Sequence, residues 1–441
     1  MKSEFRTIPG SVLAPLGFLA SGVFCDIKRL GTGKGSQKGR KRDLALIVSE
    51  VPATVAGMFT TNQVCAAPVK VCAQRVKAGT AQAIVVNSGN ANACTGRQGM
   101  KDALEMTAVA AKLLHMPVRH VLVGSTGRIG VTMPMENVWS GISEAVALLD
   151  HSSTSAGHAA EAIMTSDTRP KQIAVEFELG GKKARIGGIC KGAGMIQPGM
   201  SATGRCPAAR PLHATMLCFL TTDAAIEATA LQAELQEAVA RSFNRITVDG
   251  DMSTNDTVLV LANGLAGNSR FTTHDSRFTI FQSALNHVCL ELAKMIVHDG
   301  EGVHRVVTVR VNGAKSVADA DAAARAVANS ALVKTSWHGG DPNWGRIIDA
   351  LGYSPATVVE EKVDIGYGAT DGKKILWSLK HGQPTAAGFK ALCAAVAPKE
   401  FDLHIRLNLG KASAVMYAAD LTEAYVEFNK GDVTNPTTLG G

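Results

Sequence analysis

Short apolar segments alternate with amphipathic segments along almost the whole chain, and this alternation constrains the fold most. Strand-like segments lie at 43–51, 81–87, 120–123, 215–221, 257–262, 305–311 and 362–380. Helical periodicity marks 99–116, 135–150, 157–164, 226–243, 277–297, 317–333 and 384–396. The two types do not follow a strict strand–helix–strand series, which favours an α+β fold with layered, mixed sheets over a doubly wound sheet. We find no linker that separates independent domains.

Turn residues refine this picture at three places. Residues 171–188 are expected to form a hairpin around Gly180-Gly181, because paired glycines suit the tight turns of hairpins. The strand at 43–51 is expected to end at Pro52. The glycine-bearing segment 124–127 is expected to form a loop after the strand at 120–123.

Composition excludes several classes of protein. The 441 residues are 46% hydrophobic and 19% charged, which excludes a disordered chain. The 44 glycines show no triplet period, so the chain is not collagen-like. A net charge of +7 is modest and spread out, and it does not indicate nucleic-acid binding.

The apolar stretches do not predict a membrane segment or a secretion signal. No run of 18 apolar residues is present, so no membrane-spanning helix is expected. The stretch Ser11–Cys25 superficially resembles a signal peptide, but Pro15 and Gly17 interrupt it. We therefore expect a cytoplasmic protein.

Cysteines and histidines do not form a known metal pattern. The nine cysteines include no Cys-x-x-Cys pair and are interpreted as core thiols in a reducing compartment. The twelve histidines form no His-Glu-x-x-His motif, and His298 and His304 lack a helical ligand spacing. No metal and no dissociable organic cofactor are expected.

Two glycine-rich segments resemble nucleotide-binding motifs only superficially. The segment Gly31–Ser36 lacks the spacing of a phosphate-binding loop and its strand–helix context, so 31–42 is interpreted as a solvated basic loop. The segment Gly192-Ala193-Gly194 lacks the rest of a dinucleotide fingerprint.

The sequence Ala214-Thr215 precedes a short apolar strand and permits a specific chemistry. The Thr215 hydroxyl could attack the Ala214 carbonyl, shift the acyl group from nitrogen to oxygen, and free the Thr215 amine after hydrolysis. That amine could then act as general base for the same hydroxyl. Threonine is common in strands, so the pattern alone favours an ordinary strand residue.

Ordered motifs across the chain decide between these two interpretations. They are Arg42–Val48, Thr60–Asn62, Val86–Gly96, Ser125–Gly130, Met164–Thr168, Lys191–Pro198, Phe243–Asp251, Ser253–Thr257, Asp299–Gly302 and Asp341–Ile347. With them the chain resembles the ornithine acetyltransferase family, the bifunctional glutamate N-acetyltransferases of arginine biosynthesis. The resemblance extends from about Pro9 to Thr434.

The resemblance implies a self-cleaving precursor with an N-terminal-nucleophile active site. Cleavage between Ala214 and Thr215 gives an alpha chain of residues 1–214 and a beta chain of residues 215–441, assembled as a heterotetramer of two of each. Thr215 takes acetyl from N-acetylornithine and passes it to glutamate, and acetyl-CoA is an open second donor. Thr126 and Gly127 match the oxyanion-hole pair of the family.

Substrate contacts are carried over by the same resemblance. Thr165 matches a substrate-binding threonine, and Lys191 is implied to face the substrate α-carboxylate. Glu301 is implied to face the α-amino group, and Asn429 and Thr434 match the pair that closes the pocket. Exposed charges are common, so without the flanking matches Lys191 and Glu301 would be interpreted as solvated surface residues.

The chain departs from the family pattern before the nucleophile and after Asn429. Residues 199–213 resemble an insertion, and an alternative frame places Ser201-Ala202-Thr203 at the cleavage point. Thr203 is followed by Gly204-Arg205 and no strand, which favours Thr215. Val433 precedes Thr434, and a tail follows it. The alternatives left open are a self-processing amidohydrolase or aminopeptidase that uses water as acceptor, and a binding homologue that does not cleave itself.

Overall fold

The computed structural model describes residues 5–28, 41–204, 216–273, 275, 277–370 and 374–430. Ala214, Thr215 and Thr434, most of the basic loop 31–42 and most of the segment 199–213 lie outside these ranges. The chain forms two compact units. Unit 1 comprises the described parts of 1–244 and 251–296, and unit 2 comprises Arg245–Gly250 and Val297–Lys430.

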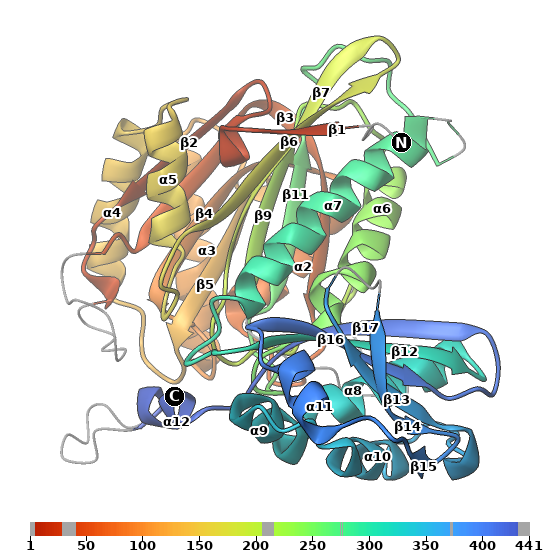
Figure 1. Cartoon of the computed structure of the whole chain (residues 1–441). Helices are drawn as coiled ribbons and strands as arrows, with labels where there is room; N and C mark the ends of the chain where they lie inside the picture. The colour runs from red at the N-terminus through yellow and green to blue at the C-terminus, as the bar shows by residue number, and fades with distance from the viewer. Residues whose placement is uncertain are drawn as a thin grey trace. The chain divides into compact units, whose positions relative to one another are not determined.

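Unit 1 is built on a ten-stranded mixed sheet (Figure 1). Its strands are β1 (Phe5–Ile8), β2 (Phe18–Val23), β3 (Leu44–Thr60), β4 (Thr80–Asn90), β5 (Val121–Arg128), β6 (Lys171–Leu179), β7 (Lys182–Lys191), β8 (Met200–Ser201), β9 (Leu217–Thr222) and β11 (Thr257–Ala262). They run in the order β1-β6-β7-β9-β11-β3-β4-β5, with β2 and β8 paired to β3. The pairs β9–β11 and β4–β5 are parallel and the others are antiparallel.

Helices cover both faces of this sheet, because alternate residues of its central strands point to opposite sides. The helices of the unit are α2 (Ala67–Arg75), α3 (Gly96–Leu113), α4 (Met135–Ala147), α5 (Ser153–Ala162), α6 (Ala228–Arg241) and α7 (Arg277–Val297). Residues of α2 to α5 share one core with Leu217 and Phe219. On the opposite face α7 packs against β7 and β9, where Gly188 leaves room for Leu220 and Leu292.

Unit 2 contains a seven-stranded mixed sheet with helices (Figure 1). Its strands, in spatial order, are β10 (Ile246–Thr247), β17 (Ala412–Ala419), β12 (Val306–Ala314), β16 (Glu400–Arg406), β13 (Asp364–Gly368), β14 (Ile375–Lys380) and β15 (Gln383–Pro384). Its helices are α8 (Val317–Asn329), α9 (Ala331–Gly339), α10 (Trp344–Gly352), α11 (Phe389–Val396) and α12 (Glu423–Phe428). Two mixed sheets with helices confirm the predicted α+β class.

Several predicted elements have the expected bounds, and others differ for physical reasons. The hairpin of β6 and β7 is confirmed, with positive φ at Gly180 and Gly181. The strand expected to end at Pro52 continues as β3, because a register shift between Val48 and Ala53 accommodates the proline. The helix expected at 317–333 is two helices, because the Ser330 side chain caps α9.

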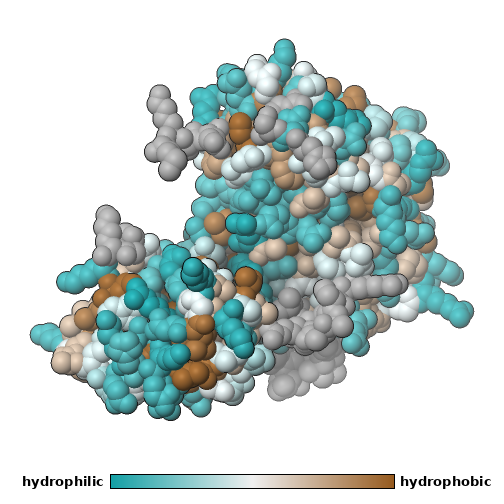
Figure 2. All heavy atoms as spheres, turned by 90° about the vertical axis from the view of Figure 1, so that its right-hand side faces the viewer, coloured by the Kyte–Doolittle hydropathy of each residue, from teal (hydrophilic) through white to brown (hydrophobic). Residues whose placement is uncertain are grey.

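The part of the surface drawn in Figure 2 is mainly polar. Figure 2 shows one face of the molecule, on which apolar residues form small groups among hydrophilic ones. Among the described residues, no helix is both long enough and apolar enough to cross a membrane. Eight described cysteines are free, and five of them are buried, which agrees with their interpretation as core thiols.

Candidate active site

Thr126 and Lys191 lie in strands that are not neighbours in the sheet of unit 1, yet their side chains are in contact. Thr126 lies near the end of β5, and Lys191 is the last residue of β7. The Lys191 Nζ donates a hydrogen bond to the Thr126 Oγ1 at 3.4 Å. Both residues are at most 2% exposed, so Lys191 is not a solvated surface charge. A buried ammonium beside a hydroxyl suits a site that receives a negatively charged group.

Gly127 occupies a position that excludes every larger residue. It lies in β5 opposite Gly89 of β4, and its φ is +130°. A Cβ atom there would come within 2.4 Å of the Gly89 carbonyl carbon. The expectation of a loop at 124–127 is therefore wrong, because the parallel pairing with β4 extends the strand to Arg128.

A buried carboxylate, Asp167, connects Thr165 to the lysine. The Asp167 Oδ2 accepts from the Thr165 N–H at 3.0 Å. Its Oδ1 accepts from the Gly192 N–H at 2.7 Å and from the Lys171 Nζ at 2.6 Å. Burial opposes ionisation of Asp167, but the Lys171 and Lys191 ammonium groups and the Gly192 N–H hold its pKa well below the usual range. Asp167 thus fixes both Thr165 and the backbone that follows Lys191.

A second buried acid, Asp256, lies beside the residue that follows Thr215. The Met216 N–H donates to the Asp256 Oδ1 at 2.5 Å. In the part of the chain that the structure describes, the Asp256 Oδ2 is buried and makes no hydrogen bond. Burial raises the pKa of Asp256 well above its ordinary value, although the Met216 N–H and the Lys191 charge act in the opposite direction. The Lys191 charge therefore acts on both Asp167 and Asp256.

Strand pairing places the start of β9 beside Lys191. Leu217, two positions after Thr215, pairs with Lys191 on one side and with Thr257 on the other. Thr126 and Lys191 are therefore held by β5 and β7, and Met216 and Asp256 lie directly before β9 and β11, which are strands of the same sheet. This rigid support is what a catalytic constellation requires.

Two further predicted residues, Glu301 and Asn429, pair with each other in unit 2. The Asn429 Nδ2 donates to the Glu301 Oε2 at 3.0 Å. The neighbouring Gly302 has a φ of +67°, and a Cβ atom there would meet the Tyr425 backbone nitrogen at 2.3 Å. The Thr422 hydroxyl also donates to the Gly302 carbonyl at 2.7 Å. The Glu301 loop and α12 are thus in direct contact.

Sequence reasoning assigned no role to Asp167 or Asp256. Each lies inside a segment that was singled out, Met164–Thr168 and Ser253–Thr257. An acid within such a polar segment is the available signal, and Asp167 also has Lys171 four residues away. The effect of Lys191 on both acids depends on strands that are distant in sequence. A hollow of about 460 Å³ elsewhere in unit 1, lined by Lys70, Asn92 and Arg97 among others, contains none of the predicted site residues.

Comparisons with known proteins agree over almost the whole chain. The ArgJ family matches residues 26–432. The chain is 47% identical over 422 residues to the arginine biosynthesis bifunctional protein ArgJ of Symbiobacterium thermophilum, covering 96% of this chain and 98% of that protein. It is 44% identical over 429 residues to the glutamate N-acetyltransferase of Methanocaldococcus jannaschii, with the same coverage.

A solved structure of similar sequence matches part of the chain. It is the ornithine acetyltransferase of Mycobacterium tuberculosis in complex with ornithine, at 36% identity and a TM-score of 0.41. The match covers 45% of this chain and 100% of that one.

Proposed function

The chain belongs to the ArgJ family and is an acetyltransferase of arginine biosynthesis, and from this premise we propose that Thr215 carries the acetyl group from N-acetylornithine to glutamate. The observation that supports this proposal most is the position of Met216. The amide of this residue, directly after Thr215, is fixed by Asp256 at the start of a strand that pairs with Lys191.

The proposed reaction has two halves. The Thr215 hydroxyl oxygen attacks the acetyl carbonyl carbon of N-acetylornithine, and the Thr215 amine takes the hydroxyl proton. The tetrahedral intermediate expels the ornithine amine, which receives that proton, and acetyl-Thr215 remains. The glutamate amine then attacks the ester carbonyl, N-acetylglutamate leaves, and the Thr215 hydroxyl regains its proton.

Thr126 and Gly127 are proposed to stabilise the oxyanion of both intermediates. Preorganised donors stabilise a developing charge because they need no reorientation during the reaction. The Thr126 hydroxyl accepts from Lys191, which leaves its own proton available to the oxyanion. The backbone of Gly127 packs directly against that of Gly89, where no side chain would fit, so its position is fixed.

Charged residues are proposed to recognise the amino-acid parts of both substrates. Lys191 is assigned to the α-carboxylate, with Thr165 as a polar neighbour held through Asp167. Glu301 is assigned to the α-amino group, with Asn429 orienting its carboxylate. Thr434 keeps its predicted role at the end of the pocket.

The processing and assembly of the chain remain part of the proposal. Self-cleavage between Ala214 and Thr215 would generate chains of residues 1–214 and 215–441 in the predicted heterotetramer, in the cytoplasm. The two compact units are defined by packing, and their boundaries differ from the proposed cleavage point between Ala214 and Thr215. Water as acceptor, in an amidohydrolase, is the less supported alternative, because a relative that is 44% identical is a glutamate N-acetyltransferase.

Peptide analysis after brief incubation with N-acetylornithine tests the acetyl carrier. We expect the peptide that begins Thr215-Met216-Leu217-Cys218 to gain one acetyl group and to lose it when glutamate is added. An acetyl group on another peptide, or acetate release that does not depend on glutamate, would contradict the proposal.

A further inference from the structure

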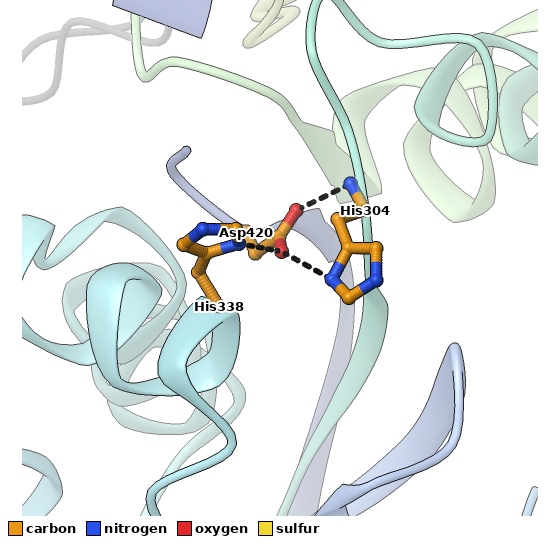
Figure 3. Close-up of side chains that lie close together, drawn as sticks. All are labelled: His304, His338 and Asp420. Carbon is orange, nitrogen blue, oxygen red and sulfur yellow. Dashed lines mark hydrogen bonds and ion pairs between the residues drawn. The ribbon is translucent and has the colours of Figure 1, made fainter. Parts of the chain in front are cut away.

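Three polar residues of unit 2 meet at one end of its sheet: His304, His338 and Asp420, which we call the His–His–Asp cluster (Figure 3). His304 precedes β12, Asp420 follows β17, and His338 lies in the last turn of α9. Antiparallel pairing of Val306 with Ala419 brings His304 and Asp420 together. Strand and helix packing, and not sequence spacing, thus assembles the cluster.

The donor atoms of the cluster converge on the carboxylate. The Asp420 Oδ1 accepts from the His304 backbone N–H at 2.9 Å. The Asp420 Oδ2 is 3.4 Å from the His338 Nδ1 and 4.0 Å from the His304 Nδ1. Figure 3 shows the carboxylate between the two rings.

The Oδ2 oxygen of the Asp420 carboxylate is buried and makes no hydrogen bond within the described residues. The Asp420 side chain is 0% exposed. Within the described residues, neither the Asp420 Oδ2 nor the His338 Nδ1 makes a hydrogen bond. A buried carboxylate oxygen without a hydrogen bond is costly, and a bound cation is one way to satisfy it.

One donor separation of the cluster already fits a tetrahedral transition metal. The three donor atoms lie within 4.8 Å of one another. Zinc bonds of about 2.0–2.2 Å place tetrahedral donor atoms roughly 3.3–3.6 Å apart, and the His338 Nδ1 and Asp420 Oδ2 are 3.4 Å apart. The His304 side chain is 49% exposed, so it can turn to shorten the longer distance.

One neighbour of the cluster, Glu423, favours metal binding, and another, Arg305, competes with it for His304. The His338 Nε2 contacts the Glu423 Oε2 at 2.8 Å, the type of outer carboxylate that orients a metal-binding histidine. The Arg305 Nη1 lies 3.2 Å from the His304 Nδ1 and also donates to the carbonyls of Trp337 and His338. A metal would replace the contact between Arg305 and the His304 Nδ1, and Arg305 would keep its three carbonyl partners, those of Trp337, His338 and Ala397. The nearby Lys334 ammonium donates to the Ala419 carbonyl.

We propose that the His–His–Asp cluster binds one zinc ion through the Nδ1 atoms of His304 and His338 and the Oδ2 of Asp420, with one open coordination position. Two imidazoles and a carboxylate form a donor set that zinc accepts readily. The ion would tie together the segments before β12, after β17 and at the end of α9. Because the Glu301 loop and α12 adjoin these segments, zinc would stabilise this end of unit 2.

Calorimetric titration of the full-length protein, stripped of metal by a chelator, with Zn²⁺ tests this proposal. We expect one ion per chain, and binding at least ten times weaker in His304→Ala and in Asp420→Asn. The asparagine retains an oxygen that can accept from the His304 N–H, which preserves the backbone contact. His298→Ala is the matched control, since this half-buried histidine contacts Glu400 at 3.1 Å outside the cluster. The zinc affinity of this variant should equal that of the unsubstituted protein.

Cobalt absorption separates this site from cysteine binding. Co²⁺ bound to nitrogen and oxygen gives visible bands without the near-ultraviolet charge-transfer band of a thiolate. A thiolate band would place the ion on a cysteine such as the exposed Cys94 and overturn the proposal. Absence of stoichiometric binding, or equal affinity in His304→Ala and the unsubstituted protein, would overturn it as well.

Discussion

The Lys191 ammonium lies 3.4 Å from the Thr126 hydroxyl, in the interior of unit 1. These two residues are 65 positions apart in the sequence, and their side chains are in contact. Asp167 accepts hydrogen bonds from the N–H of Gly192, which follows Lys191, and from the N–H of Thr165. A fixed positive charge beside a hydroxyl strengthens that hydroxyl as a donor, because it draws electron density from the oxygen. This relationship underlies the predictions that concern catalysis.

Thr126→Ala should lower kcat by about 10²–10³, the usual loss when one oxyanion donor is removed. Thr126→Ser, which retains the hydroxyl, should keep most of the activity. Steady-state kinetics of acetyl transfer from N-acetylornithine to glutamate measures both variants. Equal activity of the alanine and serine variants would show that the hydroxyl has no catalytic role.

Lys191→Gln should raise KM for N-acetylornithine and for glutamate by about 10–100-fold, because a hydrogen bond to a charged group contributes roughly 1.5–3 kcal/mol. Lys182→Gln is the matched control, since Lys182 is the exposed first residue of the same strand, β7. Its kinetics should not change. A KM unaffected by Lys191→Gln would contradict the assignment of this lysine to the carboxylate.

Asp256→Ala should destabilise the protein by about 1–3 kcal/mol more than Asp256→Asn. The alanine leaves the buried Met216 N–H without an acceptor, whereas asparagine can still provide one. Thermal unfolding compares the two, and a denaturing gel shows how completely each is cleaved. If both variants unfold at the same temperature, the Asp256–Met216 contact does not hold the start of β9.

Glu234→Gln should remove part of the pH dependence of stability. Glu234 lies buried in α6, and burial raises its pKa from 4.5 to about 8. The unfolded chain ionises this carboxyl near pH 4.5, so the folded state loses stability as the pH rises from there towards 8. Between pH 6 and pH 9 the loss due to Glu234 should be about 2–3 kcal/mol.

Denaturant unfolding at pH 6 and pH 9 checks this sign. The stability of Glu234→Gln should fall less between the two values than that of the unsubstituted protein. Glu237→Gln, on the same helix but partly exposed, should retain most of the dependence, because the Glu237 charge adds only a smaller part to the rise in the pKa of Glu234. An equal fall in both variants would show that Glu234 does not carry the effect.

Local sequence signals predicted those elements whose chemistry is local. The Gly180-Gly181 turn and the periodicity of 277–297 correctly predicted the hairpin and α7. The segment 124–127 has the residues of a turn, yet pairing with β4 makes it a strand. The strand β2 at Phe18–Val23 was not predicted, because its assignment depends on pairing with β3.

In the candidate site, too, sequence motifs predicted some residues, but not the contacts between distant strands. Family motifs identified Thr126 and Lys191, but they gave no distance between the two side chains. Asp256 acts on Met216 through a neighbouring strand, and Asp420 meets His304 through paired strand ends. Contacts of this kind arise from sheet order, which one sequence without homologues does not reveal.

The intact masses of the purified protein and of Thr215→Ala test the central claim most directly. The account predicts two chains for the unsubstituted protein, 1–214 and 215–441, and one uncut, inactive chain for the variant. A Thr215→Ala protein that is cleaved at this bond and transfers acetyl to glutamate would contradict the assignment of Thr215 as nucleophile.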